Sequence, residues 1–188
     1  MDQLFRNTHE ALTFAFNYSS QQYALSPMAK LFRTGISSGK GLVGNDGAGE
    51  AGIISSRVKK LPALQEACIV ARYAPRVEEC PCCQSRDKMT DQYREAIATL
   101  TEWAISHATG ITIRNMRAAI IRSFYERGVS VSAAAKDLGV AKATAYDQKA
   151  RIYKALKDLD LEAQRAIDAR LADLFEAEPI AVVGLAVA

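Results

Sequence analysis

The sequence predicts an all-α protein, a helical bundle with a C-terminal helix-turn-helix and a short cysteine-bearing loop. Three observations predict this fold. Apolar residues recur at helical spacing in successive segments, and Pro or Gly stands where the clearest of these segments end. Of the 188 residues, 49% are hydrophobic, which is enough for a core. We expect one domain, or two small ones that share a surface.

The first elements expected are a helix around residues 10–16 and a glycine-rich loop over 34–52. The P-loop pattern G-x-x-x-x-G-K-[ST] is not met, because Lys40 is followed by another glycine. The dinucleotide fingerprint fails as well, because no buried strand precedes the glycines. We therefore favour a loop that ends where Asn45 or Asp46 caps the next helix.

Two further helices are expected on either side of a cysteine knuckle at residues 80–83. Pro62 opens the first of them, and Pro75 ends it. The second runs from Asp91 to about His107, with apolar residues along one side. Together these elements make an N-terminal helical domain over residues 1–110.

The knuckle holds Cys80, Cys82 and Cys83, of which Cys80 and Cys83 form a C-x-x-C pair. Structural zinc needs four thiolate or imidazole ligands, commonly supplied as two such pairs. The second pair is missing. Cys68 and His107 are the candidates for the fourth ligand, and His9 is a remote third. A zinc site and a set of free thiols are the two interpretations, and metal analysis of the purified protein separates them.

Residues 111–157 have the pattern of a helix-turn-helix module. Ala135 is small enough for two helices to cross closely, and Gly139 is able to adopt the left-handed conformation that ends the first helix. A supporting helix is expected from Arg114 to Arg127. The second helix of the motif is long and amphipathic, with Ala145, Ile152 and Leu156 on its apolar side.

The start of that second helix is left open by the sequence. The turn offers Ala141 and Lys142 where a Ser or Thr cap is usual. Either Thr144 caps a helix that starts slightly later, or the first turn is left to phosphate contacts. The two possible starts of the helix place the expected base-contacting residues two or three positions apart.

The alternative to a DNA-binding motif is an ordinary helical hairpin, and charge favours the DNA-binding motif. Residues 111–157 hold ten basic and three acidic side chains, a net charge of +7, whereas the whole chain has a net charge of +3. Residues 158–178 hold seven acidic and two basic side chains. Positive charge concentrated on one element is typical of DNA binding.

The C-terminal segment is expected over residues 158–188. Residues 158–176 continue the helix or restart it after a kink. Their narrow apolar stripe packs on the parent domain or forms a homodimer. The stripe consists of Leu159, Ala163, Ile167, Leu171 and Leu174. The last ten residues are wholly apolar and cover a hydrophobic face, pair as a short strand or form a loose tail.

Several classes of protein do not fit this chain. No stretch approaches the roughly 20 apolar residues that span a bilayer, and the N-terminal residues do not resemble a secretory signal. We expect a cytoplasmic protein with no membrane contact. The chain has two histidines and no HExxH, GxSxG or paired-carboxylate pattern, so we do not expect an enzyme.

The chain resembles the late-gene antitermination proteins of lambdoid phages, the Q-type antiterminators. The resemblance lies in ALTFAFNYSSQQYALSPM at 11–28, GKGLVGNDGAGEAG at 39–52 and ALQEACIVARYAPR leading into EECPCC at 63–83. The C-terminal motif is similar to region 4 of sigma factors. The resemblance implies a protein of the bacterial host cytoplasm that docks on DNA near a late promoter. It then transfers to a paused RNA polymerase and lets it read through terminators.

The resemblance also implies which side chains face double-stranded DNA. Lys142 and Tyr146 lie nearest the base edges, and Arg122, Arg127 and Arg151 contact phosphates. The full expected set is Lys142, Thr144, Tyr146, Lys149, Arg151, Lys154, Arg122 and Arg127. The alternative functions are a promoter-bound repressor or activator, acting as a dimer through 158–176, and a small terminase subunit.

Overall fold

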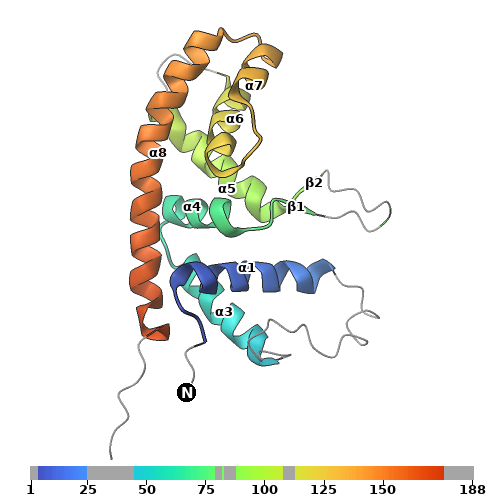
Figure 1. Cartoon of the computed structure of the whole chain (residues 1–188), viewed down its shortest axis with the longest axis vertical. Coiled ribbons are helices and arrows are strands. Elements are labelled where there is room, and N and C mark those ends of the chain that lie inside the picture. Colours follow the sequence, from blue (N-terminus) through green and yellow to red (C-terminus); the bar gives the residue numbers. More distant parts are fainter. Residues whose placement is uncertain (1–3, 25–44, 79–81, 83–87, 108–112, 176–188) are drawn as a thin grey trace, which may run out of the picture.

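A computed structural model of the chain describes residues 4–24, 45–78, 82, 88–107 and 113–175 (Figure 1). The prediction of an all-α protein is confirmed, because the described residues form helices apart from one pair of two-residue strands. The elements are α1 (Thr8–Ala24), α3 (Asn45–Lys59), α4 (Ala63–Tyr73), β1 (Val77–Glu78), β2 (Lys88–Met89), α5 (Asp91–Trp103), η1 (Ala104–His107), α6 (Arg114–Tyr125), α7 (Val131–Asp137), α8 (Lys142–Leu171) and η2 (Ala172–Leu174). Among these helices, none has the length and hydropathy that a bilayer crossing requires.

Helix α8 organises the molecule, because it runs along one edge from end to end (Figure 1). Its N-terminal part packs against α6 and α7, its middle against α4, and its C-terminal part lies near α1 and α3. Of the two alternatives for residues 158–176, the continuous helix is the one observed, as far as Leu171. Residues from all three predicted segments contribute to one hydrophobic core.

Buried residues recur every three or four positions along α8, so they lie on one side of the helix. The buried positions are Ala145, Gln148, Ile152, Leu156, Asp160, Ala163, Ile167 and Leu171. The predicted apolar stripe therefore packs on the body of the same chain. The same apolar side chains are therefore not exposed for the homodimer that was the alternative for residues 158–176.

One charged residue, Asp160, lies in this buried face. Its carboxylate accepts hydrogen bonds from Arg72 on α4, at 2.5 and 3.3 Å, from Gln164 at 2.6 Å and from the hydroxyl of Tyr125 at 3.4 Å. The Asp160 side chain is 6% exposed, and that of Arg72 is 37% exposed. The pair joins α4 to α8, and Tyr125 at the end of α6 completes the junction.

A second long-range ion pair fixes the C-terminal end of α8. Arg57 on α3 forms a two-fold contact with the carboxylate of Asp173 in η2. It also donates to the main-chain carbonyl of Arg170, at 2.6 Å. Carbonyls in the last turn of a helix have no partner within the helix, so this contact caps α8 as well as pairing charge.

Helix α3 begins at Asn45, where the expected loop ends, so glycines 47, 49 and 52 of the glycine-rich segment 34–52 lie in the first half of this helix. Glycine weakens a helix, but Ala51, Ile54 and Val58 bury one face of α3 against α1. Tertiary packing therefore outweighs local propensity. Residues 34–44 lie outside the described part of the chain.

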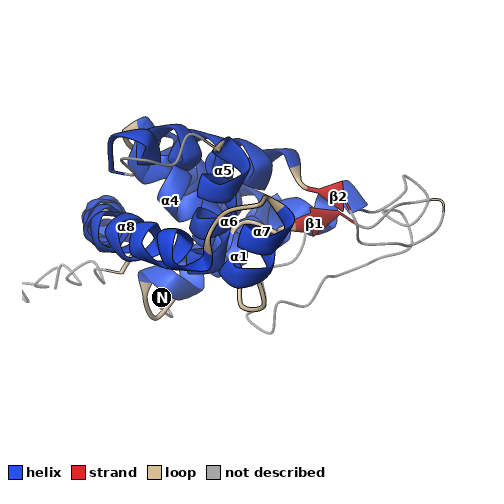
Figure 2. Cartoon of the chain, turned by 90° about the horizontal axis from the view of Figure 1, so that it is seen from above, coloured by secondary structure: helices blue, strands red, loops and turns tan. Residues whose placement is uncertain are grey.

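The β1–β2 pair was not predicted. It pairs Val77 with Met89 and Glu78 with Lys88 in antiparallel register, on the side of the molecule away from α8 (Figures 1 and 2). Thr90 stabilises the exit from β2, because its hydroxyl donates to the carbonyl of Pro75 and accepts from the main chain of Tyr93. The two strands flank the cysteine knuckle.

The buried Arg72–Asp160 pair gives a prediction about stability. Arg72→Met leaves the Asp160 carboxylate buried without its cation, so the free energy of unfolding should fall by about 3 kcal/mol. Arg72→Met combined with Asp160→Leu removes both charges and should cost less than Arg72→Met alone. Urea denaturation of the wild type and the variants measures this. A double variant that loses the sum of the two single losses would contradict the prediction.

Candidate nucleic-acid interface

The turn between α7 and α8 is held by two main-chain hydrogen bonds. The N–H of Val140 donates to the carbonyl of Ala135 at 2.8 Å, and the N–H of Gly139 donates to Lys136 at 3.2 Å. This is the Schellman arrangement, which needs a left-handed residue after the helix. Gly139 supplies it with a φ of +67°, as the sequence predicts.

Helix α7 starts from a side-chain cap and packs closely on its neighbours. The hydroxyl of Ser130 accepts a hydrogen bond from the N–H of Ala133 at 3.3 Å. Ala135 is 1% exposed where α7 meets the rest of the fold, which confirms the close packing predicted for it. Leu138 and Val140 are half-buried against the core.

Helix α8 begins at Lys142, with Ala141 in the capping position. No side chain of the described residues caps it, and Thr144 is an exposed residue of the first turn. Of the two alternatives in the sequence, the earlier start without a side-chain cap is the one observed. The N–H groups of this first turn have no partner within the helix, so they are available to water or to an anion.

The first turns of α8 have a buried side and an exposed side. Ala145, Ile152 and Leu156 are fully buried, as predicted, and Gln148 is 2% exposed. The exposed side carries cations and small residues. Its members are Lys142, Ala143, Thr144, Tyr146, Asp147, Ala150, Arg151 and Lys154.

Two lysines surround the exposed ring of Tyr146. The ammonium groups of Lys142 and Lys149 lie 5.9 and 5.8 Å from the centre of this ring. Lys149 also lies 4.8 Å from the ring centre of Tyr153, whose hydroxyl is 2.9 Å from the hydroxyl of Ser123 on α6. Contacts between Lys149 and the two tyrosine rings, followed by the hydroxyl contact of Tyr153, therefore connect the exposed side of α8 to α6.

The arginines expected to bind phosphates have different surroundings. Arg127 is exposed, and Arg151 is exposed and paired with Asp147 at 2.9 Å. Arg122 makes a two-fold contact with Glu126, at 3.0 and 3.1 Å. Burial alone would raise the pKa of Glu126, but hydrogen bonds from Arg122 and Tyr93 hold that pKa below its ordinary value. The contacts of Arg122 are thus those of a structural residue.

The positive charge counted from the sequence is only partly at the surface. Arg117 is 5% exposed, and its Nε donates to the carbonyl of Thr101 at 3.4 Å. Arg114 is exposed but pairs with Glu102 at 2.7 Å. The other exposed basic residues of this region are Arg127 and Lys136 before α8, and Lys142, Arg151, Lys154 and Lys157 on it.

The cysteines predicted as zinc ligands have different surroundings. Cys80 and Cys83 lie outside the described residues, and Cys82 is exposed. Cys68 is fully buried on α4, next to Tyr125, and burial raises the pKa of its thiol to about 11. Cys68 as the fourth zinc ligand stays a prediction, because its proposed partners Cys80 and Cys83 are not described. Zinc at the knuckle stays a prediction.

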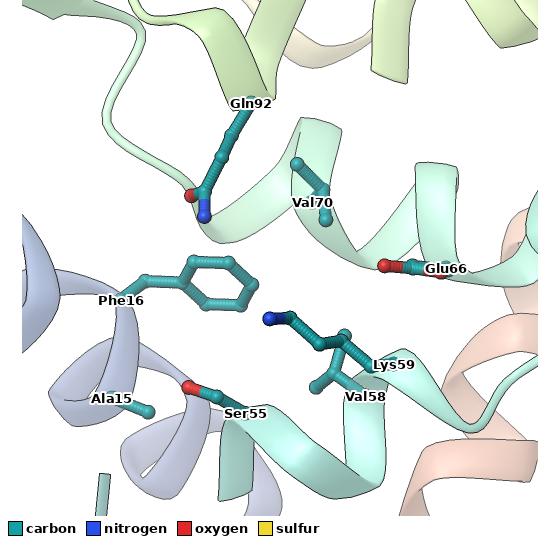
Figure 3. A pocket seen from close by; sticks show the side chains of 8 residues that line it. All are labelled: Ala15, Phe16, Ser55, Val58, Lys59, Glu66, Val70 and Gln92. Carbon is teal, nitrogen blue, oxygen red and sulfur yellow. The ribbon is translucent and has the colours of Figure 1, made fainter. Parts of the chain in front are cut away.

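One cavity lies between α1, α3, α4 and the start of α5. It has a volume of about 50 Å³, and its lining includes Phe16, Lys59, Glu66 and Gln92 (Figure 3). In Figure 3 the ammonium of Lys59 points toward the ring of Phe16. Pockets for nucleotides or drug-sized ligands are larger, about 300–1,000 Å³. This cavity is too small to be such a site.

Comparison of the chain with protein-family models, with curated proteins and with solved structures gives no match. Among the described residues, there is also no group of three or more His, Cys, Asp or Glu side chains able to hold a metal ion. The exposed side of α8 and the turn that precedes it therefore form the candidate functional site.

Two glycines should respond in opposite directions to alanine. Gly139→Ala places a Cβ at positive φ and should lower the free energy of unfolding by about 1 kcal/mol. Gly49→Ala lies within α3, with no described atom within 4 Å of the new Cβ, and should raise it by about 1 kcal/mol. Urea midpoints of the two variants check both signs. Equal shifts in the same direction would show that the turn does not need its left-handed residue.

Proposed function

We propose that the protein binds double-stranded DNA through a helix-turn-helix made of α6, α7 and the first turns of α8. One observation carries the proposal: the Schellman turn at Gly139 is followed by a helix with one side buried and the opposite side lined with cations. An α-helix presented in this way fits the major groove, and lysines at its margins reach phosphates.

The shape of the exposed side supports this docking. Ala143 and Ala150 are exposed and seven residues apart, so they lie on the same side of α8, away from the core. Small side chains there allow the helix axis to approach the floor of the groove. Lys142 stands at one margin of this side, and Lys154 follows Ala143 by about three full turns, so its long side chain extends from the same side toward the phosphates of a duplex.

We further propose that the protein acts as an antiterminator, which docks near a late promoter and then travels with RNA polymerase through terminators. The resemblance to phage antiterminators supports this role. The packing of α8 supports it indirectly, because Ala163, Ile167 and Leu171 are buried within the chain. A dimeric repressor or activator, the alternative function, therefore has no apolar stripe at 158–176 with which to pair.

The salt dependence of DNA binding tests the proposed interface. Lys149→Ala combined with Arg151→Ala should weaken binding and reduce the slope of log K against log salt by about one to two phosphate contacts. Fluorescence anisotropy over a salt series measures the slope. Arg165→Ala combined with Arg170→Ala is the matched control, since it removes the same charge from exposed positions farther along α8.

These two double variants separate a local interface from a general charge effect. If α8 docks through its N-terminal turns, the control retains the wild-type slope. Equal losses for both double variants, or no loss for either, would remove this helix from the interface.

Mapping the protein along phage DNA separates antitermination from conventional regulation. After crosslinking in the host during late expression, an antiterminator should give signal that begins near a promoter and extends through the transcribed genes. A sharp peak confined to one operator would show a promoter-bound regulator instead. The mass of the purified protein adds a second measurement, because a dimer is expected only for that regulator.

A further inference from the structure

The exposed side of α8 contains an apolar strip between its charged margins. The strip consists of Ala143, Tyr146 and Ala150, which are all exposed, and the side chain of Tyr146 stands out because the residue is 45% exposed. Their spacing of three and four residues places them on one side of the helix. Tyrosine has an apolar ring and a polar hydroxyl and is enriched at interfaces, and the alanines beside it let another molecule approach the helix closely.

The charges around the strip indicate what that molecule is. Lys142 and Lys149 lie along one margin, with their ammonium groups near the Tyr146 ring. Arg151 and Lys154 lie toward the other, together with Asp147, which pairs with Arg151 at 2.9 Å and leaves this margin with a net charge of +1. Net positive charge on both margins of a narrow apolar strip matches a groove lined by two rows of phosphates. An apolar helix of a protein partner, the other possible occupant, has no negative charge to match these cations. The surroundings of the strip therefore favour a nucleic-acid duplex.

We propose, building on the DNA-binding function above, that this strip recognises the C5-methyl groups of thymine. The thymine methyl is the apolar group that the base pairs present in the major groove, and alanine and aromatic side chains contact it. Tyr146 supplies the largest apolar area of the strip. The ammonium groups of Lys142 and Lys149 lie close to its ring, and in the complex we expect them to bind phosphates on either side of the contacted base. The protein accordingly selects sites by their thymine methyls.

Uracil-substituted DNA tests this recognition directly, because uracil lacks only the C5-methyl group. A pool of thymine-containing duplexes with a randomised core is first enriched on the wild-type protein. The enriched pool is then copied with thymine or with uracil, and the dissociation constants of both copies are measured. Each methyl contact should contribute about fourfold in affinity, so the uracil copy should bind at least fourfold more weakly.

Variants of Tyr146 assign the effect to the strip. Tyr146→Phe keeps the apolar ring and should retain the preference for thymine. Tyr146→Ala should bring the ratio of the two dissociation constants toward one, because the methyl contact and the ring are lost together. Leu161→Ala is the matched control, since Leu161 is 46% exposed on the same helix, and its ratio should equal that of the wild type.

The outcomes distinguish this inference from the function on which it rests. Absence of binding to any duplex would overturn both. Equal binding of the thymine and uracil copies would overturn the methyl recognition and leave DNA binding intact. A ratio unchanged in Tyr146→Ala would also overturn it, and loss of RNA polymerase co-purification in that variant would assign the strip to a protein partner.

Discussion

The fold depends on a single face of α8 that stays buried over the whole length of the helix. From Ala145 to Leu171 this face contacts, in turn, the helices α6 and α7, then α4, and finally the region of α1 and α3. With a break along it, the candidate interface would be joined to the N-terminal helices mainly through the packing of α6 on α5. The burial of Asp160 in the middle of this face places a charge where an apolar residue would pack, and Arg72 compensates for that charge. The N-terminal body thus sets the position of α8.

The residues with local signals were predictable from the sequence. Gly139 and Ala135 were expected at the turn, and Ala145, Ile152 and Leu156 at the buried side of the following helix, because helical spacing and turn chemistry are local. The burial of Arg117 against the carbonyl of Thr101 could not be read from the sequence, because that partner is brought close by tertiary packing. The phosphate contact expected of Arg122 stays a prediction, and in the structure Arg122 pairs with Glu126 one turn away. The β1–β2 pair was missed because two residues per strand carry no periodic signal.

Arginine and lysine serve different purposes in this part of the chain. Two arginines of α6 hold the fold, because Arg117 is buried and Arg122 pairs with the half-buried Glu126, whereas Arg114 forms an exposed pair with Glu102. The planar guanidinium suits such directional contacts. The lysines of α8 remain at the surface or beside aromatic rings. A net charge counted along the sequence mixes these two groups, and only the second contributes strongly to the field outside the protein.

The uninterrupted length of α8 has a geometric consequence for any complex with DNA. Thirty helical residues form a rod of about 45 Å, and Arg57 fastens its far end to α3. Because the rod is rigid, it fixes the orientation of the N-terminal helices relative to the first turns of α8. The groove that receives these turns would therefore also determine on which face of the duplex the N-terminal helices lie. Displacing the binding site by half a helical turn of DNA would carry these helices to the opposite face. A partner bound nearby would then meet a different surface of the protein.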